Sequence, residues 1–164
     1  MDLIDKKLKR IEELMGKKNI VGANSLADSL LKENDCNARL LSLSARIKLI
    51  MGKVDEAKRL AEIACLKHNR SIEARYVLGH CYQSMGDFED AAEVYRYVIK
   101  RVPDSAFAHF QLGESLYKVN NREESLASYQ RAAELDKEGD IRSIAETKIL
   151  DMKENMGRRV DNAG

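Results

Sequence analysis

The side chains that most often carry acid–base or metal chemistry are present, but their spacing matches no known catalytic pattern. The three histidines are His68, His80 and His109. No two of them stand four residues apart, the spacing at which one helix face can hold a zinc ion. His68 falls near the predicted end of a helix, where a cation complements the helix dipole. We therefore expect no catalytic residue and no metal site.

Adjacent carboxylates are the other arrangement that could supply a general acid and a general base. They occur as Glu12-Glu13, Glu89-Asp90 and Glu123-Glu124. On amphipathic helices such pairs are solvated charges or first-turn residues near a positive helix end. The sequence also contains no serine-hydrolase motif and no glycine loop that could cradle a phosphate. These observations favour a protein that is not an enzyme.

The cysteines indicate neither a disulfide framework nor a zinc site. They are Cys36, Cys65 and Cys81, an odd number without metal-ligand spacing. We expect reduced thiols in a cytoplasmic protein that needs no cofactor. The charged N-terminal stretch, residues 1–10, lacks an apolar signal core, and the longest apolar run is too short to span a bilayer. No membrane insertion is expected.

The charge of the chain is balanced overall but uneven along its length. The formal net charge is +1, and 34% of the residues are charged. Residues 38–71 hold eight Lys/Arg against three Asp/Glu, whereas residues 72–105 and 106–139 each hold four against six. The difference either orients a charged partner or is a chance spread of solvated charges. A near-neutral chain with acidic later segments disfavours nucleic-acid binding.

A 34-residue period organises the elements that must position these residues. Four columns of residues recur with this period: Ala23, Ala57, Ala91 and Ser125; Ile11, Ala45, Gly79 and Gly113; Ala27, Ala61, Tyr95 and Tyr129; and Leu30, Ala64, Val98 and Ala132. Small residues at fixed places mark close helix contacts, so the period predicts stacked helical pairs. Hydrophobic spacing predicts helices near residues 3–15, 20–33, 38–51, 54–68, 72–85, 88–102, 106–118, 122–135 and 140–155.

The turns within these pairs carry residues suited to a left-handed backbone. Gly52 and Gly86 lie in the second and third turns, and Asn120-Asn121 take this place in the fourth. Asparagine tolerates the left-handed conformation better than most residues. Pro103 stops the helix that precedes it.

The third period resembles a tetratricopeptide repeat (TPR). Counted from Ile72 as position 1, the matching residues are Leu78-Gly79, Tyr82, Gly86-Asp87-Phe88, Ala91, Tyr95 and Pro103. The fourth period matches at Leu112-Gly113, Leu116, Tyr129 and Ala132. The second has Lys48 where an aromatic residue is usual, and the first is the weakest match.

The resemblance covers residues 4–139 and implies an all-α fold, a right-handed superhelical TPR solenoid of four helix-turn-helix repeats. The repeats are 4–37, 38–71, 72–105 and 106–139, followed by a C-terminal capping helix at 140–155. This TPR-like domain spans residues 1–156, and residues 157–164 are expected to be a flexible tail.

The TPR resemblance also implies a concave groove lined by the first helix of each pair. The candidate partner-binding residues are Arg39, Ser42, Arg46, Leu49, Ile50, Tyr76, His80, Gln83, Phe107, Phe110, Glu114 and Tyr117. We expect another protein or peptide segment in this groove, with apolar anchors near the aromatic residues and acidic residues near Arg39 and Arg46.

The function predicted from this resemblance is a non-catalytic protein–protein interaction scaffold or adaptor. A small TPR chaperone that shields an aggregation-prone partner is one alternative. A structural subunit of a homo-oligomer is another. The five-residue clamp with which some TPR co-chaperones hold a C-terminal carboxylate is absent, because Glu12 and Glu73 occupy two of its basic or amide positions.

Overall fold

The computed structural model describes residues 3–33 and 37–161, with side chains as far as residue 154. Within these ranges the secondary structure is entirely helical. The helices are α1 (Leu3–Gly16), α2 (Ile20–Glu33), α3 (Ala38–Ile50), α4 (Val54–Lys67), α5 (Ile72–Met85), α6 (Phe88–Arg101), α7 (Ala106–Lys118), α8 (Arg122–Leu135) and α9 (Asp140–Asp161). The predicted all-α class and helix order are confirmed.

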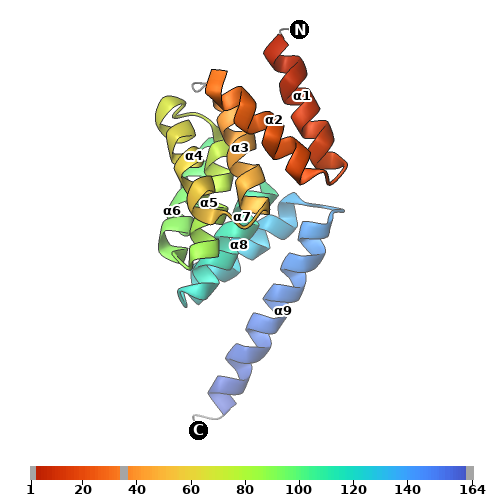
Figure 1. Ribbon diagram of the computed structural model, residues 1–164. Helices are drawn as coiled ribbons and strands as arrows, with labels where there is room; N and C mark the ends of the chain where they lie inside the picture. Colours follow the sequence, from red (N-terminus) through yellow and green to blue (C-terminus); the bar gives the residue numbers. More distant parts are fainter. Residues whose placement is uncertain (1–2, 34–36, 162–164) are drawn as a thin grey trace. The chain divides into compact units, whose positions relative to one another are not determined.

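The chain divides into two compact units, Met1–Gly86 and Asp87–Gly164. The first unit holds α1 to α5, and the second holds α6 to α9 (Figure 1). In the first unit α3 packs against α1, α2, α4 and α5. In the second unit α7 packs against α6, α8 and α9. The central helix of each unit is therefore the first helix of a predicted pair.

The turn of every repeat contains one residue in the left-handed conformation, and these residues stand one period apart. They are Lys18 (φ 58°), Gly52 (φ 75°), Gly86 (φ 87°) and Asn120 (φ 63°). The predicted role of Asn120 is confirmed. In the first turn this conformation falls on a lysine, whereas Gly16 ends α1. The Asn121 N–H then donates to the Leu116 carbonyl at 2.9 Å, which satisfies a carbonyl of the last turn of α7.

Helix starts also follow the period. Asn37, Ser71 and Ser105 precede α3, α5 and α7, and each side chain accepts a hydrogen bond from a first-turn N–H. The second helix of each later pair begins with carboxylates, such as Glu89 and Asp90 in α6. These acids complement the helix dipole, as predicted. Glu12 and Glu13 differ, because they lie inside α1 and pair with arginines.

All four sequence columns are buried, which is why the period is so strict. Ala23, Ala57, Ala91 and Ser125 are each 0% exposed. In the fourth repeat the columns meet directly, since a Cβ added at Gly113 would lie 2.8 Å from the Tyr129 ring carbon Cδ1. The Ser125 hydroxyl donates to the Gly113 carbonyl at 2.8 Å. A larger side chain at position 113 would therefore clash with the tyrosine.

Helix α9 packs on the last helical pair through a narrow apolar stripe. Ala145 and Met152 are buried with Tyr129, Ala132 and Ala133. The helix continues to Asp161, so the predicted end near residue 155 is wrong, and residues 157–161 are helical. No proline interrupts this stretch, and its lysine, glutamate, methionine and arginine residues favour helix despite Gly157. Residues 162–164 lie outside the described part of the chain.

Candidate partner-binding surface

The histidines and cysteines occupy separate structural places. His68 caps the C-terminus of α4, and the His109 imidazole Nε2 lies 2.9 Å from the Pro103 carbonyl. Cys65 and Cys81 are free thiols, and burial raises the pKa of Cys81 to about 11. Cys36 lies outside the described residues. In the part of the chain that the structure describes, no three His, Cys, Asp or Glu side chains gather as metal ligands would.

The predicted residues of the first unit lie on α3 and α5, and α3 also packs against α1. Arg39 at the start of α3 is already paired, because its guanidinium Nη2 donates to both carboxylate oxygens of Glu12 on α1 at 2.8 and 2.9 Å. This hydrogen bond raises the pKa of Arg39 above its usual value. Arg39 therefore links α3 to α1.

Arg46 lies two turns farther along α3 and has a different environment. Its side chain is exposed, and its guanidinium Nη2 lies 3.8 Å from the Met15 sulfur. No carboxylate of a described residue forms an ion pair with it. Ile50, one turn later, is 54% exposed, and Leu49 is half-buried. An unpaired cation and an exposed apolar side chain thus lie next to each other on one helix.

The other predicted residues of this unit are less accessible. Ser42 is only 6% exposed, and its hydroxyl donates to the Ala38 carbonyl at 2.9 Å. Tyr76, His80 and Gln83 are half-buried on α5, and each has further contacts within the chain. Burial lowers the pKa of His80, so its imidazole is held in the neutral form. These residues can shape the face but offer little free surface.

The predicted residues of the second unit lie on α7, and two of them are engaged by their own unit. The Phe110 ring lies 5.6 Å from the Tyr129 ring and packs on the cluster that contains Ala145 of α9. Glu114 accepts a hydrogen bond from the Tyr129 hydroxyl and pairs with Lys148 of α9 at 2.8 Å. Burial and this carboxylate raise the pKa of Tyr129. Phe110 and Glu114 therefore serve the packing of α9.

Phe107 and Tyr117, at the two ends of α7, remain more open. Each is 37% exposed. The Arg122 guanidinium lies 5.9 Å from the centre of the Tyr117 ring, which covers one ring face. These two residues are more exposed than Phe110, the third predicted aromatic anchor of the second unit, which is half-buried.

A buried lysine is a feature that the sequence analysis passed over. Lys48 is 7% exposed, and its ammonium lies 3.1 Å from Asp28 of α2 and 3.4 Å from Glu56 of α4. It occupies the position where the TPR pattern has an aromatic residue. The lysine at this position was the signal in the sequence that something unusual is buried here. Its partners Asp28 and Glu56 lie on other helices, so residue spacing alone does not reveal the two ion pairs.

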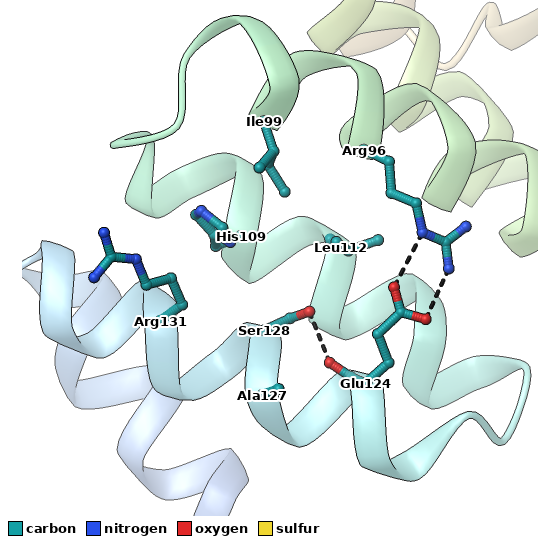
Figure 2. Close-up of a pocket in the computed structure, with 8 residues that line it drawn as sticks. All are labelled: Arg96, Ile99, His109, Leu112, Glu124, Ala127, Ser128 and Arg131. Atoms are coloured by element: carbon teal, nitrogen blue, oxygen red, sulfur yellow. Dashed lines mark hydrogen bonds and ion pairs between the residues drawn. The ribbon is translucent and has the colours of Figure 1, made fainter.

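A shallow pocket of about 280 Å³ lies between α6 and α8 over α7. Figure 2 shows its apolar lining, which includes Ile99 of α6, Leu112 of α7 and Ala127 of α8. At one end Arg96 grips Glu124 with two hydrogen bonds of 3.0 and 2.9 Å. This pair raises the pKa of Arg96 and lowers that of Glu124. The charges of Arg96 and Glu124 therefore neutralise each other, and Arg131, which also lines the pocket, pairs with Glu134 at 3.0 Å.

No helix in the described part of the chain combines the length and the apolar character that crossing a bilayer requires.

Comparison with known proteins places the fold. The chain resembles the crystal structure of TTC0263, a thermophilic TPR protein of Thermus thermophilus, with 24% identity and a TM-score of 0.78 over 94% of this chain and 83% of that one. MamA of AMB-1 gives 18% identity and a TM-score of 0.76 over 96% and 82% of the two chains. PcrH of Pseudomonas aeruginosa gives 18% identity and a TM-score of 0.67 over 71% of this chain and 91% of that one. At these identities the likeness establishes the fold.

A protein-family model shows which family the chain belongs to. No curated protein sequence matches the chain. The model described as "Anaphase-promoting complex, cyclosome, subunit 3" matches residues 50–132, which is half of the chain. This segment runs from the end of α3 to the last turn of α8 and includes the third period, which carries the TPR motif. The chain therefore belongs to this family of tetratricopeptide repeat proteins.

Proposed function

We propose that this protein is a non-catalytic adaptor that binds a segment of another protein on the face formed by α1, α3 and α5. The family match and the fold support a protein-interaction scaffold in general. The matching family model is named for a subunit of a complex, which fits a chain that acts through contacts with other proteins. A cytoplasmic location and independence from any cofactor are parts of the same proposal.

The observation that carries the proposal is the pair formed by Arg46 and Ile50. The two residues stand one turn apart on α3, so their side chains lie on the same side of the helix. Arg46 has no carboxylate partner among the described residues, and Ile50 is 54% exposed. A partner that places a carboxylate beside an apolar side chain would satisfy both residues at once.

Neighbouring contacts make this face suitable for binding because they hold its backbone in place. The Arg39–Glu12 bond links α3 to α1, and Asn37 caps the start of α3. Rigid helices lose less conformational entropy on binding than a mobile loop would. Truncating the apolar anchor should cost about 2 kcal/mol of binding, whereas losing the exposed arginine should mainly slow association and reduce its salt dependence.

Affinity capture from the native host tests this proposal. The bait would be the wild-type chain, the double variant Arg46→Glu/Ile50→Ser and the control Arg59→Glu, which carries the same charge reversal on exposed α4. We expect the double variant to lose a partner that the wild type and the control retain. Matching circular dichroism spectra and melting curves would show that all three baits are folded.

The opposite pattern would end the proposal. If Arg59→Glu loses the partner while Arg46→Glu/Ile50→Ser keeps it, the partner does not use the α1, α3 and α5 face. A solution mass above that of the monomer, abolished by the double variant, would instead assign the face to contacts between copies of the chain.

A further inference from the structure

The outer side of α4 carries an apolar stripe with arginines at both ends. Arg59, Ile63 and Leu66 follow one another at intervals of four and three residues, so they share one side of the helix. Ile63 is 39% exposed and Leu66 is 83% exposed. Arg70 follows in the turn after the helix and is also exposed. We call Arg59, Ile63, Leu66 and Arg70 the α4 stripe.

The two arginines of the α4 stripe form no ion pair with a described residue, whereas several neighbouring lysines have partners. Lys48 and Lys53 both pair with Glu56, and the Lys58 ammonium lies 4.6 Å from the centre of the Tyr82 ring. Arg59 and Arg70 form no ion pair with any described residue. Asp55 stands one turn before Arg59 without pairing with it. The stripe therefore presents uncompensated positive charge on both sides of exposed apolar surface.

We infer that the α4 stripe is a second docking site, separate from the proposed α1, α3 and α5 face, for an acidic amphipathic helix of another protein. Two apolar side chains one turn apart on that helix would cover Ile63 and Leu66. Carboxylates one turn before and one turn after them would reach Arg59 and Arg70. This charge complementarity supplies both orientation and faster association.

A second copy of this chain fits the α4 stripe less well. If two copies of α4 pack antiparallel so that Ile63 of each covers Leu66 of the other, Arg59 of each copy faces Arg70 of the other. Parallel packing places each arginine against its own counterpart. Like charges that face each other across an interface oppose association. The charge pattern therefore favours an acidic partner over self-association.

The test uses the full chain and a labelled synthetic helical peptide of about four turns. The acidic probe has two leucines one turn apart, with glutamates one turn before and one turn after them. A second probe has lysines in place of the glutamates, and a third is a scramble of the acidic probe. Fluorescence anisotropy measures the affinity of the wild type, Arg59→Glu/Arg70→Glu, Leu66→Ala, Arg46→Glu and the control Lys100→Glu, which reverses an exposed charge on α6.

The expected pattern has two parts. Arg59→Glu/Arg70→Glu and Leu66→Ala should each weaken binding of the acidic probe by about tenfold or more, whereas the control Lys100→Glu should bind it as the wild type does. The charge-reversed variant should instead prefer the lysine probe. With the wild type, the acidic probe should shift the amide resonances of residues 59–70 in a ¹⁵N-correlation spectrum, and the scramble should not.

Three results would overturn the inference. One is equal affinity of the acidic probe for the wild type and Arg59→Glu/Arg70→Glu. Another is loss of probe binding in Arg46→Glu alone, which would move the site to the α1, α3 and α5 face. The third is a concentration-dependent dimer that Leu66→Ala abolishes, because the stripe would then be a contact between copies. Failure of the α4 inference leaves the capture experiment on Arg46 and Ile50 unaffected.

Discussion

Helices α3 and α7 are the first helices of the second and fourth repeats, yet residues at equivalent positions in them have different structural environments. Arg46 and Glu114 stand two periods apart, and so do Ser42 and Phe110. Arg46 is exposed and unpaired among the described residues, whereas Glu114 binds Tyr129 and Lys148. The difference comes from Tyr129 of α8 and Lys148 of α9, which both bind Glu114. A repeat position therefore keeps an accessible side chain only where no other helix of its unit engages it.

The largest effect in this comparison should follow removal of α9. A chain that ends at Gly139 loses Ala145 and Met152 and exposes Tyr129, Ala132 and Ala133. We expect a loss of more than about 3 kcal/mol in the free energy of unfolding of the second unit, because truncating one buried methionine to alanine already costs about 2–5 kcal/mol and the deletion removes the whole helix. Urea denaturation measures the stability, and sedimentation measures the association expected from the exposed surface. A monomeric truncated chain of unchanged stability would show that α9 is dispensable.

The tight contact at Gly113 should give the next effect. Gly113→Ala places a methyl group 2.8 Å from a ring carbon of Tyr129, so the helices must separate or the ring must move. We expect a loss of about 1–3 kcal/mol in the free energy of unfolding. Gly16→Ala is the matched control, because no atom lies within 4 Å of its added Cβ. Similar melting curves for the two variants would contradict the close contact.

In the second repeat, unlike the fourth, a buried lysine links the first helix to its neighbours: Lys48 of α3 pairs with Asp28 of α2 and Glu56 of α4. Lys48→Ala removes a buried stem and leaves Asp28 and Glu56 without their shared cation. We expect it to cost about 1–3 kcal/mol, within the range for a broken buried network. Lys48→Met also removes the cation but keeps the buried volume, and it should stay within about 1 kcal/mol of the wild type, because Asp28 and Glu56 are 42% and 49% exposed and water can solvate their carboxylates. Urea titration measures both, and equal losses would show that charge rather than packing matters.

The smallest effect concerns the first turn. Lys18 adopts φ 58°, where Gly52 and Gly86 stand in the equivalent turns. Lys18→Gly relieves the left-handed strain and should stabilise the chain by about 0.5–1 kcal/mol. Gly86→Ala introduces the same strain and should destabilise it by a similar amount. Thermal melts measure both changes, and a shift of the same sign in the two variants would count against this explanation.

Most of the helical architecture could be predicted from the sequence, because the residues that start and end the helices recur with the period and act on the backbone near them. Turn residues such as Asn120 and the first-turn acids Glu89 and Asp90 act within a few residues of themselves. The end of α9 was misjudged because the prediction relied on apolar content, whereas the helix continues on backbone propensity.

The candidate site was harder to predict because its decisive contacts join distant residues. Arg39 meets Glu12, and Glu114 meets Lys148, across separate helices. No local pattern marks these pairs, so the sequence could place Arg46 and Glu114 at equivalent positions but could not show which was free. The ion pairs of the buried Lys48 could not be predicted for the same reason, since Asp28 and Glu56 lie on the two neighbouring helices.

Site-specific photo-crosslinking in the native host tests the central difference between α3 and α7 most directly. A benzoylphenylalanine would replace Ile50 in one variant and Phe110 in another. We predict a partner adduct from position 50, where the side chain is exposed, and none from position 110, where the ring packs on Tyr129. A partner adduct from position 110 with none from position 50 would contradict the account.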